Sequence, residues 1–147
     1  RLFDGQVIAA HNAAFDIAVL RASCEARGLK MPKVDPFCSV EMSRIAWPEL
    51  PHHRLNSLAE EFGLELNHHN AIGDATACAQ LVLLCADQFG AQNIEELRGM
   101  LAIKARRTAY EKKRQAILEA QRKAMLEAHQ QSLLESQQFL DSYPQHG

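Results

Sequence analysis

The sequence predicts a helix-rich α/β fold with few parallel strands, followed by a long C-terminal helical extension. A short apolar run at 6–10, rich in strand formers, leads at once into helical spacing of apolar residues over 13–27. A second apolar helical pattern covers 71–89, and 102–140 contains good helix formers with no glycine or proline. A strand that runs directly into a helix is typical of α/β domains, so these observations favour that class.

The first strand and helix have recognisable ends. Residues 6–10 are expected to form a strand buried on both faces, because their apolar run does not alternate with polar residues. Asn12 is the expected N-cap of the helix over 13–27, and Gly28 should end that helix in a left-handed conformation. Phe15 belongs to the apolar stripe that we expect to face the core.

Three shorter elements follow. We expect a second short strand at 33–38 and a short helix at 39–47 that ends before Pro48. Another short helix is expected at 56–62, where Gly63 stops it.

The helix over 71–89 has a wide apolar stripe. Leu81 and Leu84 widen its apolar stripe so far that we expect it to be covered on most sides, and Gly90 should end it. After Asn93, which is an expected cap, the pattern predicts either one long helix or two stacked helices.

Composition indicates a globular protein. The chain has 147 residues, 47% of them hydrophobic and 23% charged, which is enough for one domain with a core. The apolar stretches are too short to cross a bilayer, and the four cysteines lack C-x-x-C spacing, so we expect a cytoplasmic protein without a membrane partner. Residues 1–102 hold 8 Lys/Arg against 13 Asp/Glu, whereas 103–147 hold 8 against 5, which predicts a boundary near residue 102.

Two short motifs carry the candidate chemistry. Segment 11–16 reads HNAAFD directly after the first strand, and segment 68–74 reads HHNAIGD at the start of an apolar helix. Either Asp16 or Asp74 alone could simply be a carboxylate that is stabilised by the dipole at a helix N-terminus. Together they offer the hard oxygen ligands that Mg²⁺ or Mn²⁺ prefers. His69 precedes Asp74 by five residues, and a helix N-terminus favours its neutral form, which can act as a base.

In combination and order, these motifs resemble the second and third motifs of the DEDDh-type, DnaQ-like 3′→5′ exonucleases. Segments 35–44 and 53–59 extend the similarity, which covers about residues 5–90. That family includes the polymerase III epsilon-like proofreading subunits of bacteria and RNase T. The resemblance implies an RNase H-like fold and phosphodiester hydrolysis at nucleic-acid 3′ ends with two Mg²⁺ or Mn²⁺ ions.

The resemblance also implies roles for individual residues. Asp16 matches the metal-site aspartate of the second motif, Asp74 matches the metal ligand of the third, and His69 matches the general base. Asn12 and Phe15 match residues that fix the second-motif turn, pack beneath the site and contact substrate. The expected catalytic set is therefore His69, Asp16 and Asp74.

The first motif of the family, an Asp-x-Glu pair on a strand, does not occur in the sequence. We therefore expect an N-terminally truncated fragment that is inactive alone, with 1–102 as the C-terminal part of an exonuclease domain and 103–147 as a basic helical extension. The alternative is a non-catalytic module that binds nucleic acid or a polymerase through a degenerate exonuclease fold. The coding DNA upstream of Arg1 would separate these two hypotheses.

The expected partner is the 3′ end of a single strand, with DNA favoured over RNA, although the sequence does not decide between them. The basic run over 104–123 could hold phosphates or form a solvated helix face. Apolar residues recur every seven positions from Ile103 to Ile117, which is a weak coiled-coil signal. A protein partner or self-association through this helix is therefore a further hypothesis.

Overall fold

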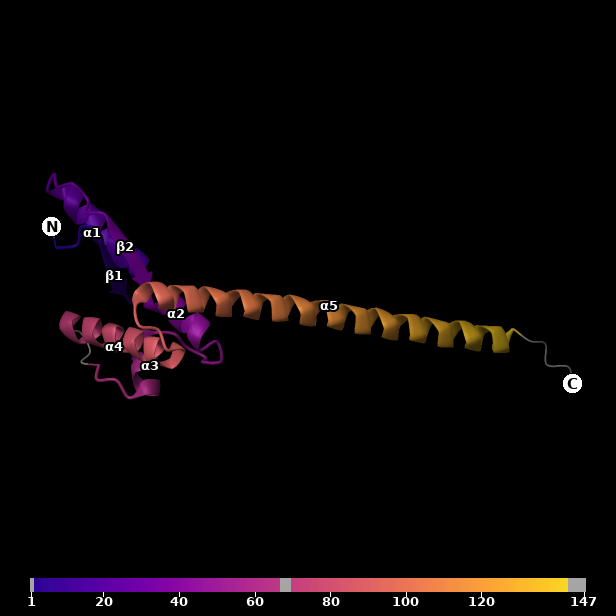
Figure 1. Ribbon diagram of the computed structural model, residues 1–147. Coiled ribbons are helices and arrows are strands. Elements are labelled where there is room, and N and C mark those ends of the chain that lie inside the picture. The colour runs from indigo at the N-terminus through magenta and orange to yellow at the C-terminus, as the bar shows by residue number, and fades with distance from the viewer. Residues whose placement is uncertain (1, 67–69, 143–147) are drawn as a thin grey trace, which may run out of the picture. The chain divides into compact units, whose positions relative to one another are not determined.

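The computed structural model describes residues 2–66 and 70–142, and Figure 1 labels the elements of this part of the chain. Its elements, in order, are β1 (Gln6–Ala10), α1 (Ala13–Ala26), β2 (Val34–Cys38), α2 (Ser39–Ala46), α3 (Leu55–Phe62), α4 (Ala71–Phe89) and α5 (Ile94–Asp141). The chain divides into two compact units, residues 1–105 and 106–147. The predicted helix-rich architecture, with two parallel strands and a long C-terminal helix, is observed.

Strands β1 and β2 pair in parallel, from Gln6 opposite Val34 to Ala10 opposite Cys38. Helix α1 connects them, and the carboxyl ends of both strands therefore meet at one edge of the sheet. The prediction that 6–10 is buried on both faces is wrong, because β2 is its one neighbouring strand among the described residues and most of the strand is exposed.

Helix α1 begins and ends where predicted, although its N-cap residue does not cap through its side chain. Gly28 follows it with φ +61°, and Leu29 N–H donates to the Cys24 carbonyl over 2.9 Å, as in a left-handed cap. Asn12 occupies the N-cap position as predicted, but it is left-handed, with φ 73°, and its side chain forms no capping hydrogen bond. Phe15 is 65% exposed, so the prediction that it packs in the interior is wrong.

The core of unit 1–105 lies among α2, α3, α4 and the first turns of α5. Leu58 and Leu81 are fully buried, and the Trp47 ring lies 4.5 Å from that of Phe62. Trp47 Nε1–H also donates to the Gln88 amide oxygen over 2.6 Å, which satisfies its polar end. The buried cluster consists of Phe37, Met42, Ala46, Trp47, Leu58, Leu81, Cys85, Leu97 and Leu101.

Helix α4 has the predicted bounds but is covered on fewer sides than predicted. Asn70 caps it by accepting a hydrogen bond from Ile72 N–H over 3.0 Å, and Gly90 ends it with φ +69°. Leu83 is 68% exposed and Leu84 is 36% exposed. The prediction of coverage on most sides is wrong, because within the described structure the buried residues of α4 lie on one face, namely Ala77, Cys78, Leu81 and Cys85.

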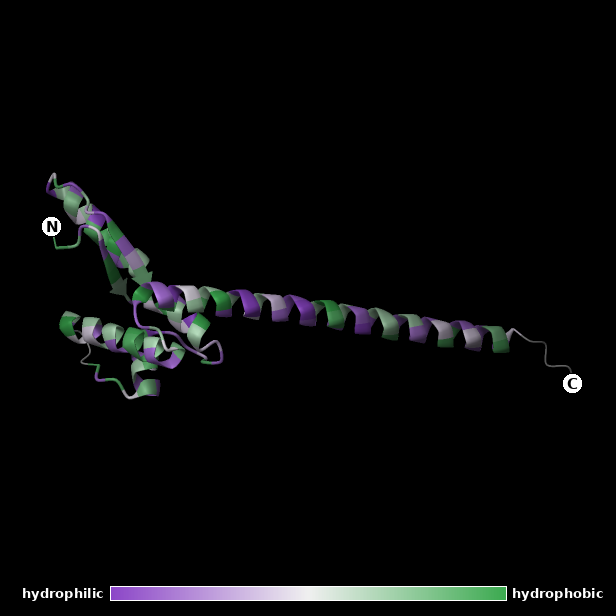
Figure 2. Cartoon of the chain, in the orientation of Figure 1, coloured by the Kyte–Doolittle hydropathy of each residue, from purple (hydrophilic) through white to green (hydrophobic). Residues whose placement is uncertain are grey.

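Of the two alternatives for the C-terminal segment, α5 is one continuous helix. Asn93 caps it, since its side chain accepts a hydrogen bond from Glu96 N–H over 2.9 Å. Within unit 106–147 the described helix is exposed apart from the partly buried Thr108, and Figure 2 shows polar and apolar residues interleaved along it. No helix among the described residues is long and apolar enough to span a bilayer.

Candidate functional site

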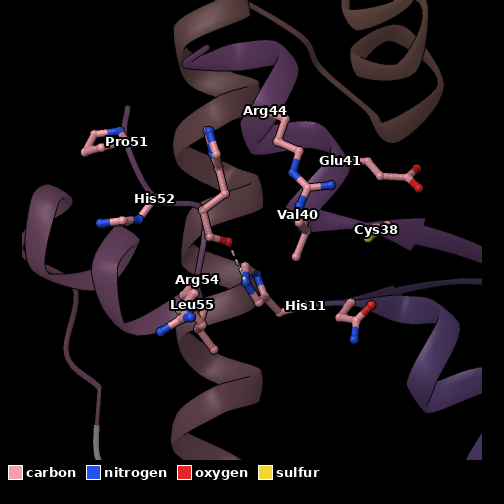
Figure 3. A pocket seen from close by; sticks show the side chains of 11 residues that line it. His11, Cys38, Val40, Glu41, Arg44, Pro51, His52, Arg54 and Leu55 are labelled. Carbon is pink, nitrogen blue, oxygen red and sulfur yellow. Dashed lines mark hydrogen bonds between the residues drawn. The ribbon is translucent and has the colours of Figure 1, made fainter. Parts of the chain in front are cut away.

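A cavity of about 590 Å³ lies where β1 and β2 end. Ligand sites of open parallel sheets form at this edge. Its walls come from the turn after β1, from the start of α2 and from the loop before α3, as Figure 3 shows. The lining residues are His11, Asn12, Cys38, Val40, Glu41, Arg44, Pro51, His52, His53, Arg54 and Leu55.

His11 connects these three segments. Its Nδ1 lies 2.9 Å from Ser39 Oγ, and its Nε2 lies 3.1 Å from the His53 carbonyl oxygen, a hydrogen bond drawn in Figure 3. Because a carbonyl can only accept, the network assigns the proton to Nε2. The Ser39 hydroxyl lies 3.5 Å from the Ala10 carbonyl but is closer to Nδ1, which therefore accepts from it. Burial lowers the pKa of His11, although the bond to the His53 carbonyl opposes this effect. The ring is therefore held neutral in one tautomer.

The same network reaches α4 through Cys78. The Cys78 thiol donates to Ser39 Oγ over 3.4 Å, and Ser39 is fully buried. Burial raises the pKa of the Cys78 thiol, and the negative charge of Asp16 raises it further. Asp16 therefore lies within electrostatic range of Cys78, which follows Asp74 by one helical turn.

A second histidine is held in a similar way. His53 Nδ1 lies 3.1 Å from Ser43 Oγ, and the Ser43 hydroxyl donates to the Val40 carbonyl over 2.9 Å. Since that hydroxyl proton is already used, His53 Nδ1–H is the donor to Ser43. Burial lowers the pKa of His53, and the positive charge of Arg44 lowers it further. Its partner Ser43 lies ten positions away in another element, so no local sequence pattern indicates this hydrogen bond.

The structure places the predicted site residues in different surroundings. Asp16 and Asp74 lie exposed in the first turns of α1 and α4, and Asn12 lines the cavity. Phe15 projects from α1 into solvent. His69 lies outside the described residues. Within 2–66 and 70–142, no group of three or more His, Cys, Asp or Glu side chains could hold a metal ion.

Comparison with known proteins identifies similarity over this same region. An exonuclease family model matches residues 1–82. The DNA polymerase III PolC-type protein of Halalkalibacterium halodurans is 40% identical over 77 residues, and that of Bacillus subtilis is 39% identical over 82 residues. Each alignment covers 52% of this chain.

A third relative extends the similarity toward α5. The PolC-type protein of Caldanaerobacter subterraneus is 30% identical over 101 residues, which is 66% of this chain. The chain spans only 5 to 7% of the length of these curated relatives. No solved structure matches the chain significantly.

Proposed function

Because the chain belongs to the exonuclease family, whose model covers residues 1–82, we propose that the protein containing it hydrolyses phosphodiester bonds at nucleic-acid 3′ ends. The observation that carries the proposal is that the family match over residues 1–82 includes both motifs, in their predicted order. The PolC-type relatives favour DNA over RNA as the substrate and DNA replication as the setting. The parallel β1-α1-β2 unit is then part of an RNase H-like sheet.

In this proposal, Asp16 and Asp74 supply two carboxylates to a site for two Mg²⁺ or Mn²⁺ ions. Bound metal would activate the attacking water and stabilise the leaving oxygen. The described residues fit such a site only in part, because two carboxylates are too few ligands for two hard cations. The remaining ligands are proposed to lie outside the described residues, and the 147-residue chain alone is proposed to be inactive.

The other proposed roles belong to residues around the motifs. His69 accepts the proton of the attacking water as general base. The exposed ring of Phe15 offers a face on which a base of a single strand can stack, and Asn12 borders the cavity at the end of β1. Residues 1–102 are proposed as the C-terminal part of the exonuclease domain, and 103–147 as an extension that binds a protein partner or a second copy.

The incomplete set of metal ligands among the described residues favours one alternative. In it, the domain binds nucleic acid or a polymerase without cleaving. The two functions differ in one measurable property, which is metal-dependent release of nucleotides by the full-length protein.

The test uses full-length protein with a single-stranded DNA labelled at one end, and Mn²⁺ binding measured by calorimetry. His69→Ala should lower turnover by about 10²- to 10⁴-fold with Mn²⁺ binding largely intact, because it removes only the general base. Asp74→Ala should damage both turnover and Mn²⁺ binding. Asp87→Ala, an exposed aspartate at the other end of α4, is the matched control and should change neither.

Three results would count against this proposal. Unchanged Mn²⁺ binding in Asp74→Ala removes its ligand role. Nucleotide release from the 5′ end contradicts the polarity. Absence of any metal-dependent release by the full-length protein favours the binding module instead.

A further inference from the structure

The cavity at the ends of β1 and β2 is basic. Arg44 and Arg54 line it from α2 and from the residue before α3, whereas Glu41 is the one acidic residue among those that line it. Within the described part of the chain, neither guanidinium group forms an ion pair or a hydrogen bond, in contrast to that of Arg98, which pairs with Asp35. Both guanidinium groups are therefore available to an anion.

The neighbouring groups leave this charge uncompensated. Glu41 lines the same cavity as Arg44 but forms no ion pair with it in the described structure. The positive charge of Arg44 reaches His53, since it contributes to the lowered pKa of that ring. His11 and His53 are held by fixed hydrogen bonds, which shape the wall of the cavity. Among the described residues, the cavity thus presents two unpaired guanidinium groups beside two histidines that are held by hydrogen bonds.

The chemistry of the lining selects a phosphate ligand. Guanidinium groups match the oxygen geometry of phosphate, and two of them on separate elements can hold one phosphate or two adjacent phosphates. None of the lining residues is Phe, Tyr or Trp, so the charged guanidinium groups, rather than a large aromatic platform, are the main source of binding. Asn12 lines the cavity and precedes Asp16 by four residues, which places the cavity beside the second motif.

We propose that Arg44 and Arg54 bind the phosphodiester backbone of the single strand whose 3′ end the protein degrades. This inference rests on the proposed function for its substrate and adds the surface that holds the strand. Binding is independent of base sequence, because phosphate contacts carry no sequence information. Glu41 weakens it by repelling the same backbone.

The test measures binding of a fluorescein-labelled single-stranded oligodeoxynucleotide to the 147-residue chain by anisotropy, in EDTA and over a range of salt concentrations. The slope of log K against log salt is negative, and each phosphate contact to a single strand adds about 0.7 to its magnitude. The double variant Arg44→Gln with Arg54→Gln should therefore reduce that magnitude by about 1.4. By the same relation, binding at 0.1 M salt should weaken roughly 25-fold.

Matched variants separate charge from folding. Arg27→Gln removes an exposed arginine at the far end of α1 and should leave binding unchanged. Arg44→Lys with Arg54→Lys keeps the charge and should retain most of the affinity and the slope. Glu41→Gln should strengthen binding, with the largest gain at low salt. Trp47 fluorescence, which reports the buried core, confirms that each variant is folded.

The outcomes distinguish this inference from the proposed function. An unchanged slope in the double glutamine variant, or no binding by the unaltered chain in EDTA, overturns the phosphate site whatever the nuclease activity. A reduced slope together with full-length protein that releases no nucleotides supports the phosphate site and rejects the exonuclease proposal. An equal loss of binding in Arg27→Gln overturns the assignment to this cavity.

Discussion

Replacing Ser39 with alanine tests the buried network that joins β1, α2 and α4. Ser39 is fully buried, and its hydroxyl lies 2.9 Å from His11 Nδ1 and 3.4 Å from Cys78 Sγ. Alanine leaves the partly buried Nδ1 without a partner, and leaving a buried polar group unsatisfied costs about 1–3 kcal/mol. We therefore expect Ser39→Ala to lower the free energy of unfolding of unit 1–105 by that amount.

Ser23→Ala is the matched control, because it removes the same hydroxyl from an exposed site. Ser23 Oγ donates to the Val19 carbonyl over 2.8 Å within α1, and water can replace that bond. Alanine has the higher helix propensity, so this variant should be unchanged or more stable by up to about 0.5 kcal/mol.

The assay is urea denaturation at pH 7.5 followed by the fluorescence of Trp47. The chain contains one tryptophan, and it lies 6% exposed in the core of unit 1–105, so its signal reports that unit. The midpoint and the slope together give the free energy of unfolding. A loss below about 0.5 kcal/mol in Ser39→Ala, or an equal loss in Ser23→Ala, would refute the reasoning.

Two further predictions concern titration and reactivity. Burial lowers the pKa of His11 and His53 in the folded state, so the unfolded chain binds more protons, and stability should fall as pH drops through about 6.5. His11→Gln should flatten that dependence in urea denaturation between pH 7.5 and 5.5, and an unchanged slope contradicts the role of His11. Burial raises the pKa of Cys85 to about 11, so its thiol is protonated and unreactive at pH 8, and iodoacetamide should modify the partly exposed Cys38 first. Peptide mass spectra measure the two modification rates, and equal rates for Cys38 and Cys85 would contradict this prediction.

Sequence alone predicted the features that depend on neighbours along the chain. Gly63 and Gly90 end α3 and α4 where expected, because each supplies a left-handed residue that the local backbone needs. The apolar pattern of 71–89 gave the bounds of α4, since helical periodicity is a local property. The order of the two motifs also predicted the exonuclease family that the match over 1–82 shows.

Sequence also led to errors about which residues are covered. Phe15 and Leu84 were expected in the interior because apolar spacing marks them as stripe residues, and both are exposed in the described structure. An apolar stripe indicates which side of a helix can be buried. Whether that side is buried depends on the elements that pack against it.

The candidate site likewise combines features that the sequence determines with features that only folding creates. The sequence by itself determined the helix ends, the two motifs and the family, because these depend on residues close together in the chain. Only the tertiary structure showed that His11 bonds to the backbone of His53, 42 positions away, and that Arg44 and Arg54 line one cavity. No local pattern records such contacts, because chain folding alone brings the end of β1, the start of α2 and the loop before α3 together.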